Sequence, residues 1–172
     1  MLDFDGEDSV ASTAAESLRA KGALASLTRE CGPDVALLEA WRARTKRTKQ
    51  PAPLAMRLCE ARCRVVRRCL ASMLHPGTRV VSLGAGLDAE MLRLRGRAAV
   101  VEVDCEGVAD RKRELLEVTG LAHDDHQVVA LDLRDVQGLR SLLTSLRPAV
   151  AIAECVLPYL DVDAATAVRR VV

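Results

Sequence analysis

The sequence predicts an α/β protein with a parallel sheet that is covered by helices on both faces. Three observations carry this prediction. Four short apolar runs alternate with helix-like segments after residue 78, the first run stops at Gly84 and Gly86, and each run ends near a polar residue. Near-continuous apolar strands that alternate with helices are typical of a doubly covered parallel sheet.

Composition narrows the class of protein further. The chain has 172 residues with 49% hydrophobic and 2% aromatic residues, and its net charge is +1. A core of useful size can form, whereas few side chains could stack on bases and no strong field favours nucleic acid. No apolar run reaches the roughly 18 residues of a membrane span. The first residues are acidic, which does not suit a signal or transit peptide, so we expect a cytoplasmic protein without a membrane or nucleic-acid partner.

Residues 1–75 are expected to form an N-terminal helical extension and cap. The patterns predict helices over Val10–Leu27, Val35–Trp41 and Leu54–Leu74. Lys21 falls within the first of them, where a solvated lysine is the ordinary interpretation. The basic run from Arg42 to Gln50 is expected to be an exposed loop. In the third helix, the predicted apolar stripe consists of Leu54, Leu58, Ala61, Val65 and Leu70.

Cysteine and histidine patterns do not predict a metal site. The six cysteines include no C-x-x-C pair, and we expect free, buried, reduced thiols, with Cys59 and Cys63 close enough on one helix to touch. The run from His123 to His126 lies before the third strand, at the amino edge of the sheet. Nothing else in the chain supplies a further ligand there, so no metal is expected.

The glycine corner is the strongest local signal. Arg79–Leu83 is the first predicted strand, Gly84 and Gly86 form a tight turn, and Asp88–Leu94 is predicted to be helical. Glycines let the backbone approach a ligand, and a helix start offers free N–H groups. In doubly wound sheets a nucleotide-like cofactor binds at this corner. A strand-to-helix turn without a ligand is the ordinary alternative.

Acidic residues follow the remaining strands. Because the carboxyl ends of parallel strands meet at one edge, we expect Glu102, Asp104, Asp132 and Glu154 to converge there. Asp104 lies 20 residues after Gly84, at a distance that suits hydrogen bonds from ribose hydroxyls. The alternative for each acid is a helix N-cap, which explains Asp135 better. The predicted strands are 98–104, 127–133 and 148–155, and the predicted helices are 108–118, 136–146 and 162 to the end.

Dinucleotide oxidoreductases and S-adenosylmethionine methyltransferases both fit this edge. Only the two glycines Gly84 and Gly86 are present, with Ala89 where the full G-x-G-x-x-G/A dinucleotide fingerprint allows glycine or alanine, and a long helical extension precedes the first strand. Both points favour a methyltransferase, while a nicotinamide-dependent enzyme stays open.

Four segments resemble motifs of the leucine carboxyl methyltransferase family. The family's "NLGAG-x-D", "EVD", "DLRD" and "AECVL-x-Y" resemble Val81–Asp88, Val101–Asp104, Leu131–Asp135 and Ala153–Leu160. Upstream, Val10–Lys21 is similar in spacing to the family's N-terminal helix. Arg57–Arg62 resembles "RGYFAR" through its two arginines, while the glycine and both aromatics of the motif are absent. A relative that methylates a carboxyl group in tRNA wybutosine synthesis shares most of these motifs.

The resemblance implies a function and a set of roles. It implies S-adenosylmethionine-dependent methyl esterification of the C-terminal leucine of type 2A protein phosphatase catalytic subunits, so this phosphatase is the expected partner. No catalytic side chain is expected, because a C-terminal carboxylate is already ionised at pH 7. The implied contacts are Lys21 with the cofactor, Arg62 with its methionine carboxylate, Gly84 lining the site, Asp104 or Glu102 with the ribose, Asp132 and Leu133 with the adenine, and Glu154 near the methionine end.

The family's fold has seven strands in the order 3-2-1-4-5-7-6, whereas this sequence ends soon after a fourth. We therefore expect a partial methyltransferase domain over residues 76–172. The fourth strand would be a bare edge unless a missing C-terminal half or another chain covers it. A non-catalytic, cofactor-binding remnant remains an alternative.

Overall fold

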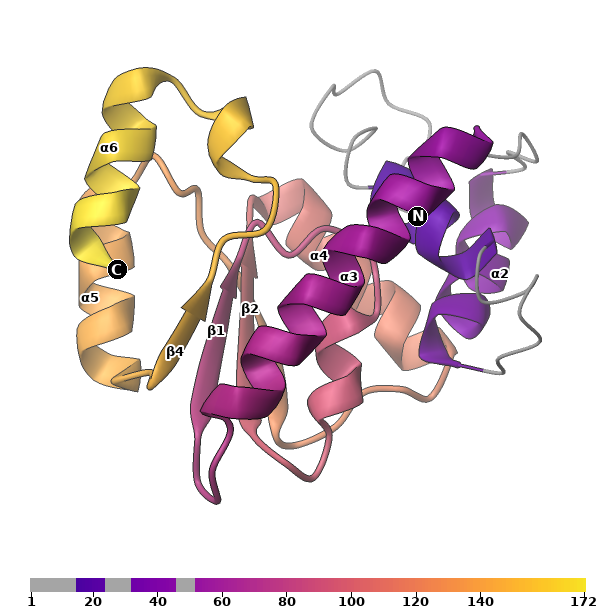
Figure 1. Ribbon diagram of the computed structural model, residues 1–172, viewed down its shortest axis with the longest axis horizontal. Coiled ribbons are helices and arrows are strands. Elements are labelled where there is room, and N and C mark those ends of the chain that lie inside the picture. Colours follow the sequence, from indigo (N-terminus) through magenta and orange to yellow (C-terminus); the bar gives the residue numbers. More distant parts are fainter. Residues whose placement is uncertain (1–14, 24–31, 46–51) are drawn as a thin grey trace.

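The computed structural model describes residues 15–23, 32–45 and 52–172, and it is a three-layer α/β structure (Figure 1). Residues 15–23 form a helix, which is followed by the elements α2 (Pro33–Thr45), α3 (Pro53–Met73), β1 (Arg79–Leu83), η1 (Glu90–Leu94), β2 (Ala99–Asp104), α4 (Glu106–Val118), β3 (His126–Ala130), α5 (Val136–Leu146), β4 (Val150–Ile152), η2 (Leu157–Tyr159) and α6 (Val162–Val171).

The sheet is parallel throughout, with the strand order β3-β2-β1-β4. The α/β class and the parallel sheet predicted from the sequence are confirmed. Val80 and Val81 of β1 point to opposite faces and are both fully buried, as expected for a strand covered on both sides. Within the described residues β4 pairs only with β1, so the coverage of its other edge stays a prediction.

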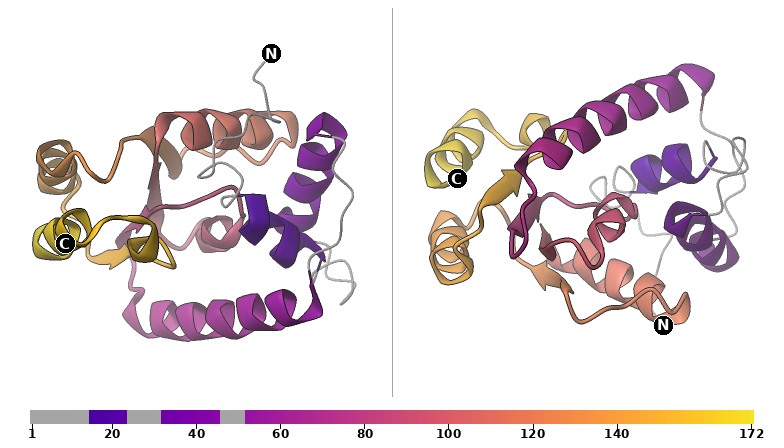
Figure 2. Two further views of the ribbon diagram at one scale, coloured as in Figure 1. Left: turned by 90° about the horizontal axis from the view of Figure 1, so that it is seen from above. Right: turned by 60° about the horizontal axis from the view of Figure 1, so that its bottom comes forward.

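Different helices cover the two faces of the sheet (Figure 2). On one face, Val81, Leu83, Val101 and Val103 pack against α5 and α6. On the other, Val80 and Val100 pack against α3 and η1, and α4 covers the β3 side. The carboxyl ends of β1, β2 and β3 are thereby left at one rim, where the glycine corner and the loop after β3 lie.

The N-terminal helices share a core with the sheet domain. Leu18 of the first helix and Trp41 of α2 pack in one cluster with Leu87, Leu92 and Leu115. The helix 15–23 is thus held directly beside the turn that follows β1. A domain boundary at residues 75 and 76 stays a prediction.

The predicted apolar stripe of α3 is wrong. Leu54, Leu58 and Val65 are 68%, 58% and 61% exposed, whereas Leu70 is buried. The inner face carries Cys59 and Cys63, which pack against Ala20, and Leu70, which packs on the sheet. Period 3.6 identifies a stripe, but it does not say which of two stripes faces the core.

Several predicted boundaries also differ from the structure. The basic segment begins inside a helix, since α2 extends to Thr45, and residues 46–50 of that run lie outside the described residues. The helix after the glycine corner is the 3₁₀ helix η1. The third and fourth strands end at Ala130 and Ile152, so the acids predicted to end them lie in the loops beyond.

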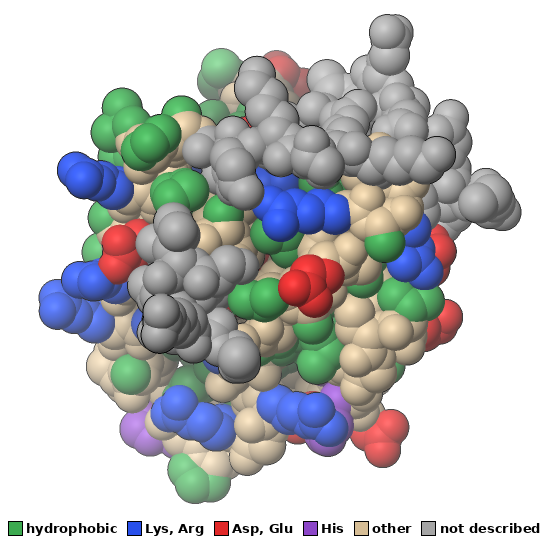
Figure 3. Space-filling view, turned by 90° about the vertical axis from the view of Figure 1, so that its right-hand side faces the viewer, with side chains coloured by type: hydrophobic (Ala, Val, Ile, Leu, Met, Phe, Trp, Pro, Cys, Tyr) green, Lys and Arg blue, Asp and Glu red, His purple; other side chains and the backbone are tan. Residues whose placement is uncertain are grey.

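Cys59, Cys63, Cys69 and Cys155 are free thiols, of which Cys59 and Cys63 are buried, while Cys69 and Cys155 are exposed. The prediction of buried thiols is therefore wrong for these last two. No helix in the described ranges is both long and apolar enough to span a membrane. On the side of the molecule that faces the viewer in Figure 3, basic, acidic and hydrophobic side chains are interspersed.

Candidate functional site

The glycine corner is tied to the end of β2 by its backbone. Gly84 and Ala85 both donate their N–H groups to the carbonyl of Val103, at 2.8 and 3.2 Å. Gly84 and Gly86 have φ values of 67° and 59°, in the left-handed region that favours glycine. A Cβ on Gly84 would lie 2.2 Å from Cγ2 of Val156, so the turn is also closely covered from the loop after β4.

Asp104, at the end of β2, holds the glycine corner by hydrogen bonds. Its Oδ2 accepts a hydrogen bond from Gly86 N at 2.8 Å, and its Oδ1 accepts one from Cys105 N at 2.8 Å. A carboxylate has about four acceptor positions, so two remain for a ligand's hydroxyl groups. Its predicted place beside the glycines is what the structure shows, while its role toward a ribose stays a prediction.

The N-terminal helix brings a buried lysine to the same corner. Lys21 is 5% exposed, and its Nζ lies 2.9 Å from Oδ2 of Asp88, which also accepts a hydrogen bond from Ser17 Oγ at 2.8 Å. Burial works to lower the pKa of Lys21, but the charges of Asp88 and Glu154 outweigh it and the pKa is raised. Lys21 is thus a buried, charged side chain, and the ordinary interpretation as a solvated lysine is wrong.

Asp88 is the complementary half of this pair. Burial would raise its pKa, but the charges of Lys21 and Lys112 and the N–H of Glu90 lower the pKa from 3.8 to about 2. Sequence reasoning placed Asp88 in a motif without assigning it to the site. Its position two residues after Gly86 was the available signal, but its partner on a helix 67 residues away could not be identified from that spacing.

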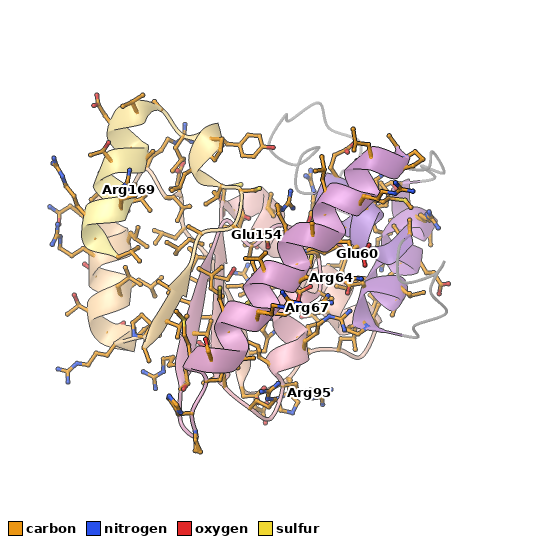
Figure 4. All side chains as sticks on the ribbon, viewed as in Figure 1. Glu60, Arg64, Arg67, Arg95, Glu154 and Arg169 are labelled. Atoms are coloured by element: carbon orange, nitrogen blue, oxygen red, sulfur yellow. The ribbon has the colours of Figure 1, made fainter. Side chains whose placement is uncertain are left out.

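Arg62 and Glu154 complete the cluster. Arg62 Nε donates to Glu154 Oε1 at 2.8 Å, and Lys21 Nζ lies 3.9 Å from Glu154 Oε2. Arg62 comes from α3, and Glu154 comes from the loop after β4, beside α3 (Figure 4). Two cations and two carboxylates from four segments therefore meet beside the glycine corner.

Asp132 and Leu133 lie beyond β3 and outside this cluster. Asp132 accepts hydrogen bonds from Arg134, and these lower the pKa of Asp132. The side chain of Leu133 is buried in the core on the α5 side, so only its backbone is free to line a site at the rim. Among the described residues, no hydrogen bond or ion pair joins Asp132 or Leu133 to the cluster of Lys21, Arg62, Asp88 and Glu154.

Glu102 does not converge on the rim as predicted. It lies within β2, it is 1% exposed, and its two oxygens bind Lys112 Nζ at 2.6 Å and His126 Nε2 at 2.7 Å. Glu102 and Asp104 are two residues apart and therefore lie on the same face of β2, but Glu102 is buried within the strand beside Lys112 of α4, whereas Asp104 stands at the end of the strand. The structure thus gives Asp104, and not Glu102, a position at the glycine corner.

The His123–His126 run has other partners. His123 is hydrogen-bonded to Asp125, and His126 is bound to Glu102. Among the residues described, no group of three or more histidine, cysteine, aspartate or glutamate side chains is placed to hold a metal ion. A cavity of about 470 Å³ lies elsewhere, between the start of α2, η1 and Leu121, and none of the candidate site residues lines it.

The fold and the cluster of charged residues at the glycine corner define the class of protein domain. A parallel 3-2-1-4 sheet with a glycine turn after β1 and an acid at the end of β2 is a Rossmann-like domain of the type that binds nucleotide cofactors.

The chain belongs to the leucine carboxyl methyltransferase family, whose model matches residues 8–172. The human "tRNA wybutosine-synthesizing protein 4" is 32% identical over 67% of this chain and 22% of its own length. The "Leucine carboxyl methyltransferase 1 homolog" of Arabidopsis thaliana is 29% identical over 72% of this chain and 46% of its own length. The chain thus spans less than half the length of these curated relatives. The family that the sequence motifs predicted is confirmed.

Proposed function

We propose that this protein binds S-adenosylmethionine at the glycine corner and transfers its methyl group to a carboxylate. The observation that carries the proposal is the meeting of Lys21, Arg62, Asp88 and Glu154 beside Gly84 and Asp104. S-adenosylmethionine has an adenosine and, at the other end, a zwitterionic amino acid. Asp104 can accept hydrogen bonds from the ribose hydroxyls of the adenosine. The two cations and two carboxylates can pair with the carboxylate and the amino group of the amino acid.

The chain's own residues would share the binding as follows. Arg62, whose side chain is 41% exposed, is the accessible cation and would hold the methionine carboxylate, with Lys21 behind it. Glu154 would face the amino group, and Asp104 would accept the ribose hydroxyls. Asp132 and the backbone of Leu133 would lie toward the adenine.

The proposed reaction requires mainly that the protein align the methyl donor with the acceptor carboxylate. When bound, S-adenosylmethionine supplies an electrophilic methyl group on a sulfonium. The acceptor carboxylate has a pKa of about 3.3–3.7 and is ionised at pH 7, so no general base is needed. Holding two reactants in line and excluding water can contribute roughly 7–11 kcal/mol. This is consistent with a site built from binding residues rather than from a nucleophile and base.

The favoured acceptor is the C-terminal leucine carboxylate of a type 2A protein phosphatase catalytic subunit. The family and the Arabidopsis relative support this proposal. The similarity to the human wybutosine-synthesizing protein favours a tRNA carboxyl group as a second candidate. A cofactor-binding protein without activity is the third.

Calorimetric titration with S-adenosylhomocysteine tests the cofactor proposal. We expect binding by the wild type and at least tenfold weaker binding by Arg62→Ala and Asp104→Asn. Arg140→Ala, in an exposed position of α5, is the matched control and should bind as the wild type does. Folded protein that gives no binding heat would contradict the proposal.

A second assay distinguishes the acceptors. The protein is incubated with methyl-labelled S-adenosylmethionine and either the phosphatase catalytic subunit or unmodified tRNA. Label in the phosphatase that is lost when its C-terminal leucine is removed supports the favoured acceptor. Label in tRNA alone would replace it with the second candidate, and cofactor binding without transfer would favour the third.

A further inference from the structure

We propose that Lys112 is a positioning residue that fixes Asp104, the ribose-binding acid, by holding the opposite end of the Ala85–Gly86 peptide group. The inference rests on the proposed function, because it concerns how the same site recognises the ribose. It assigns a role to a lysine that is buried beneath the glycine corner.

The peptide group between Ala85 and Gly86 is held at both ends. Lys112, on α4, is 1% exposed, and its Nζ lies 3.5 Å from the carbonyl oxygen of Ala85. The N–H of Gly86 belongs to the same peptide group and donates to Asp104 Oδ2 at 2.8 Å. The peptide is trans, so its oxygen and its hydrogen point in opposite directions. A cation therefore stands at the negative end of this dipole and a carboxylate at the positive end.

The flexibility of Gly86 is the reason that the Ala85–Gly86 peptide group needs a contact at each end. Gly86, at a φ of 59°, can adopt positive and negative φ values with similar ease. Without Lys112, the Ala85–Gly86 peptide would be free to rotate and turn its N–H away from Asp104. The carboxylate would then lose the hydrogen bond that orients its Oδ2. Lys112 thus acts on the ligand through the backbone and through Asp104, without touching the ligand itself.

Glu102 explains how a charged lysine is tolerated at this depth. Its Oε1 lies 2.6 Å from Lys112 Nζ, while its Oε2 binds His126 Nε2 at 2.7 Å. Removing only one member of a buried ion pair leaves an uncompensated charge and destabilises the protein. The test therefore removes both charges together in the variant Lys112→Met/Glu102→Gln, in which the glutamine can still accept the hydrogen bond from His126.

The experiment measures two dissociation constants on the full chain, one for S-adenosylhomocysteine and one for its 2′-deoxy analogue. The quantity compared is the dissociation constant of the analogue divided by that of S-adenosylhomocysteine. In the wild type we expect the analogue to bind at least tenfold more weakly. In the double variant we expect this ratio to fall at least fivefold, as in Asp104→Asn. A purely structural role would change stability and leave the ratio as it is. Arg113→Met, at the next position of α4, is the matched control and should keep the wild-type ratio.

A folded double variant with the wild-type ratio would overturn the inference. Lys112→Gln/Glu102→Gln, which keeps a shorter neutral donor at position 112 and leaves no unpaired charge, is the second variant, and its ratio should also fall. Failure of both variants to fold would make Lys112 a residue of the folding core and overturn its positioning role. If the wild type binds neither ligand, the proposed function itself is wrong, which is a different result from a ratio that does not change.

Discussion

At the scale of single residues, the pair of Lys21 and Asp88 shows how a short motif acquires a role. Asp88 receives hydrogen bonds from Lys21, Ser17 and the backbone of Glu90. An acid that follows a glycine turn is an ordinary N-cap candidate, and nothing in its neighbours distinguishes it. Asp88 becomes part of a buried ion pair because the N-terminal helix packs beside the glycine corner and brings Lys21 to it.

Asp88 should make the protein sensitive to acid. The folded state keeps Asp88 ionised down to its pKa of about 2, whereas the unfolded state takes up the proton near pH 3.8. The unfolded state therefore binds more protons in this window, and stability is lost as the pH falls from about 4 to 2. Asp88→Asn should lower the free energy of unfolding by about 3 kcal/mol at pH 7, and this difference should shrink by about 2 kcal/mol by pH 2.

Urea unfolding of both proteins across this pH range measures the effect. Asp163→Asn, in an exposed position at the start of α6, is the control and should change stability by less than about 0.5 kcal/mol. A difference between wild type and Asp88→Asn that does not vary with pH would contradict the prediction.

Gly84 has both a left-handed backbone conformation and a close neighbour, Val156, whereas Gly77 has only the left-handed conformation. Gly84→Ala would place a Cβ 2.2 Å from Val156 in a left-handed conformation, whereas Gly77, at a φ of 83°, has no atom within 4 Å of that position. Gly77→Ala should therefore cost about 1–2 kcal/mol from backbone strain alone. Gly84→Ala should cost about 1–3 kcal/mol more, because it also overpacks the loop after β4.

A double-mutant cycle identifies the contact. Val156→Ala added to Gly84→Ala should recover part of the loss, and thermal or urea unfolding gives the coupling energy. Equal costs at the two glycines would show that Val156 does not cover the corner.

At the scale of elements, α3 illustrates how two stripes on one helix compete. Leu54, Leu58 and Val65 make the more hydrophobic stripe, yet the structure buries the one with Cys59, Cys63 and Leu70. Two thiols are small enough to let the helix 15–23 approach, and Ala20 packs against them. Arg62 then lies at the edge of the buried face, where it reaches Glu154.

Alanine substitutions on opposite faces of α3 test this orientation. Leu70→Ala should lower the free energy of unfolding by about 2–5 kcal/mol, because it leaves a cavity on the sheet. Leu58→Ala, at a 58% exposed position, should change it by less than about 0.5 kcal/mol. Urea unfolding measures both, and a larger cost for Leu58→Ala would contradict the orientation.

At the scale of the whole molecule, the N-terminal helices and the sheet should unfold together. Trp41, the chain's single tryptophan, is buried with Leu18, Leu87 and Leu115 in one cluster. Its fluorescence should therefore follow the same urea transition as the far-ultraviolet circular dichroism, which reports helices and strands throughout the chain. An earlier fluorescence transition would show that residues 1–75 form a separate unit, as a boundary at residue 75 predicts.

The parts of the site that could be predicted are those set by strand order. Gly84 and Asp104 follow neighbouring parallel strands, and the sheet edge brings them together whatever the loops do. Glu102 was misplaced because two acids stand two residues apart, and only the actual end of β2 shows which of them reaches the rim. The contacts of Lys112 under the corner have no local sequence signal.

By itself, the sequence determined the α/β class, the parallel sheet and the family, because apolar runs, glycine turns and short motifs are local properties of the chain. The tertiary structure decided which face of α3 is buried, which acid stands at the rim, and that Lys21 and Arg62 meet Asp88 and Glu154. These depend on how helices dock on the sheet. Docking is settled by the fit of side chains that lie far apart in the sequence.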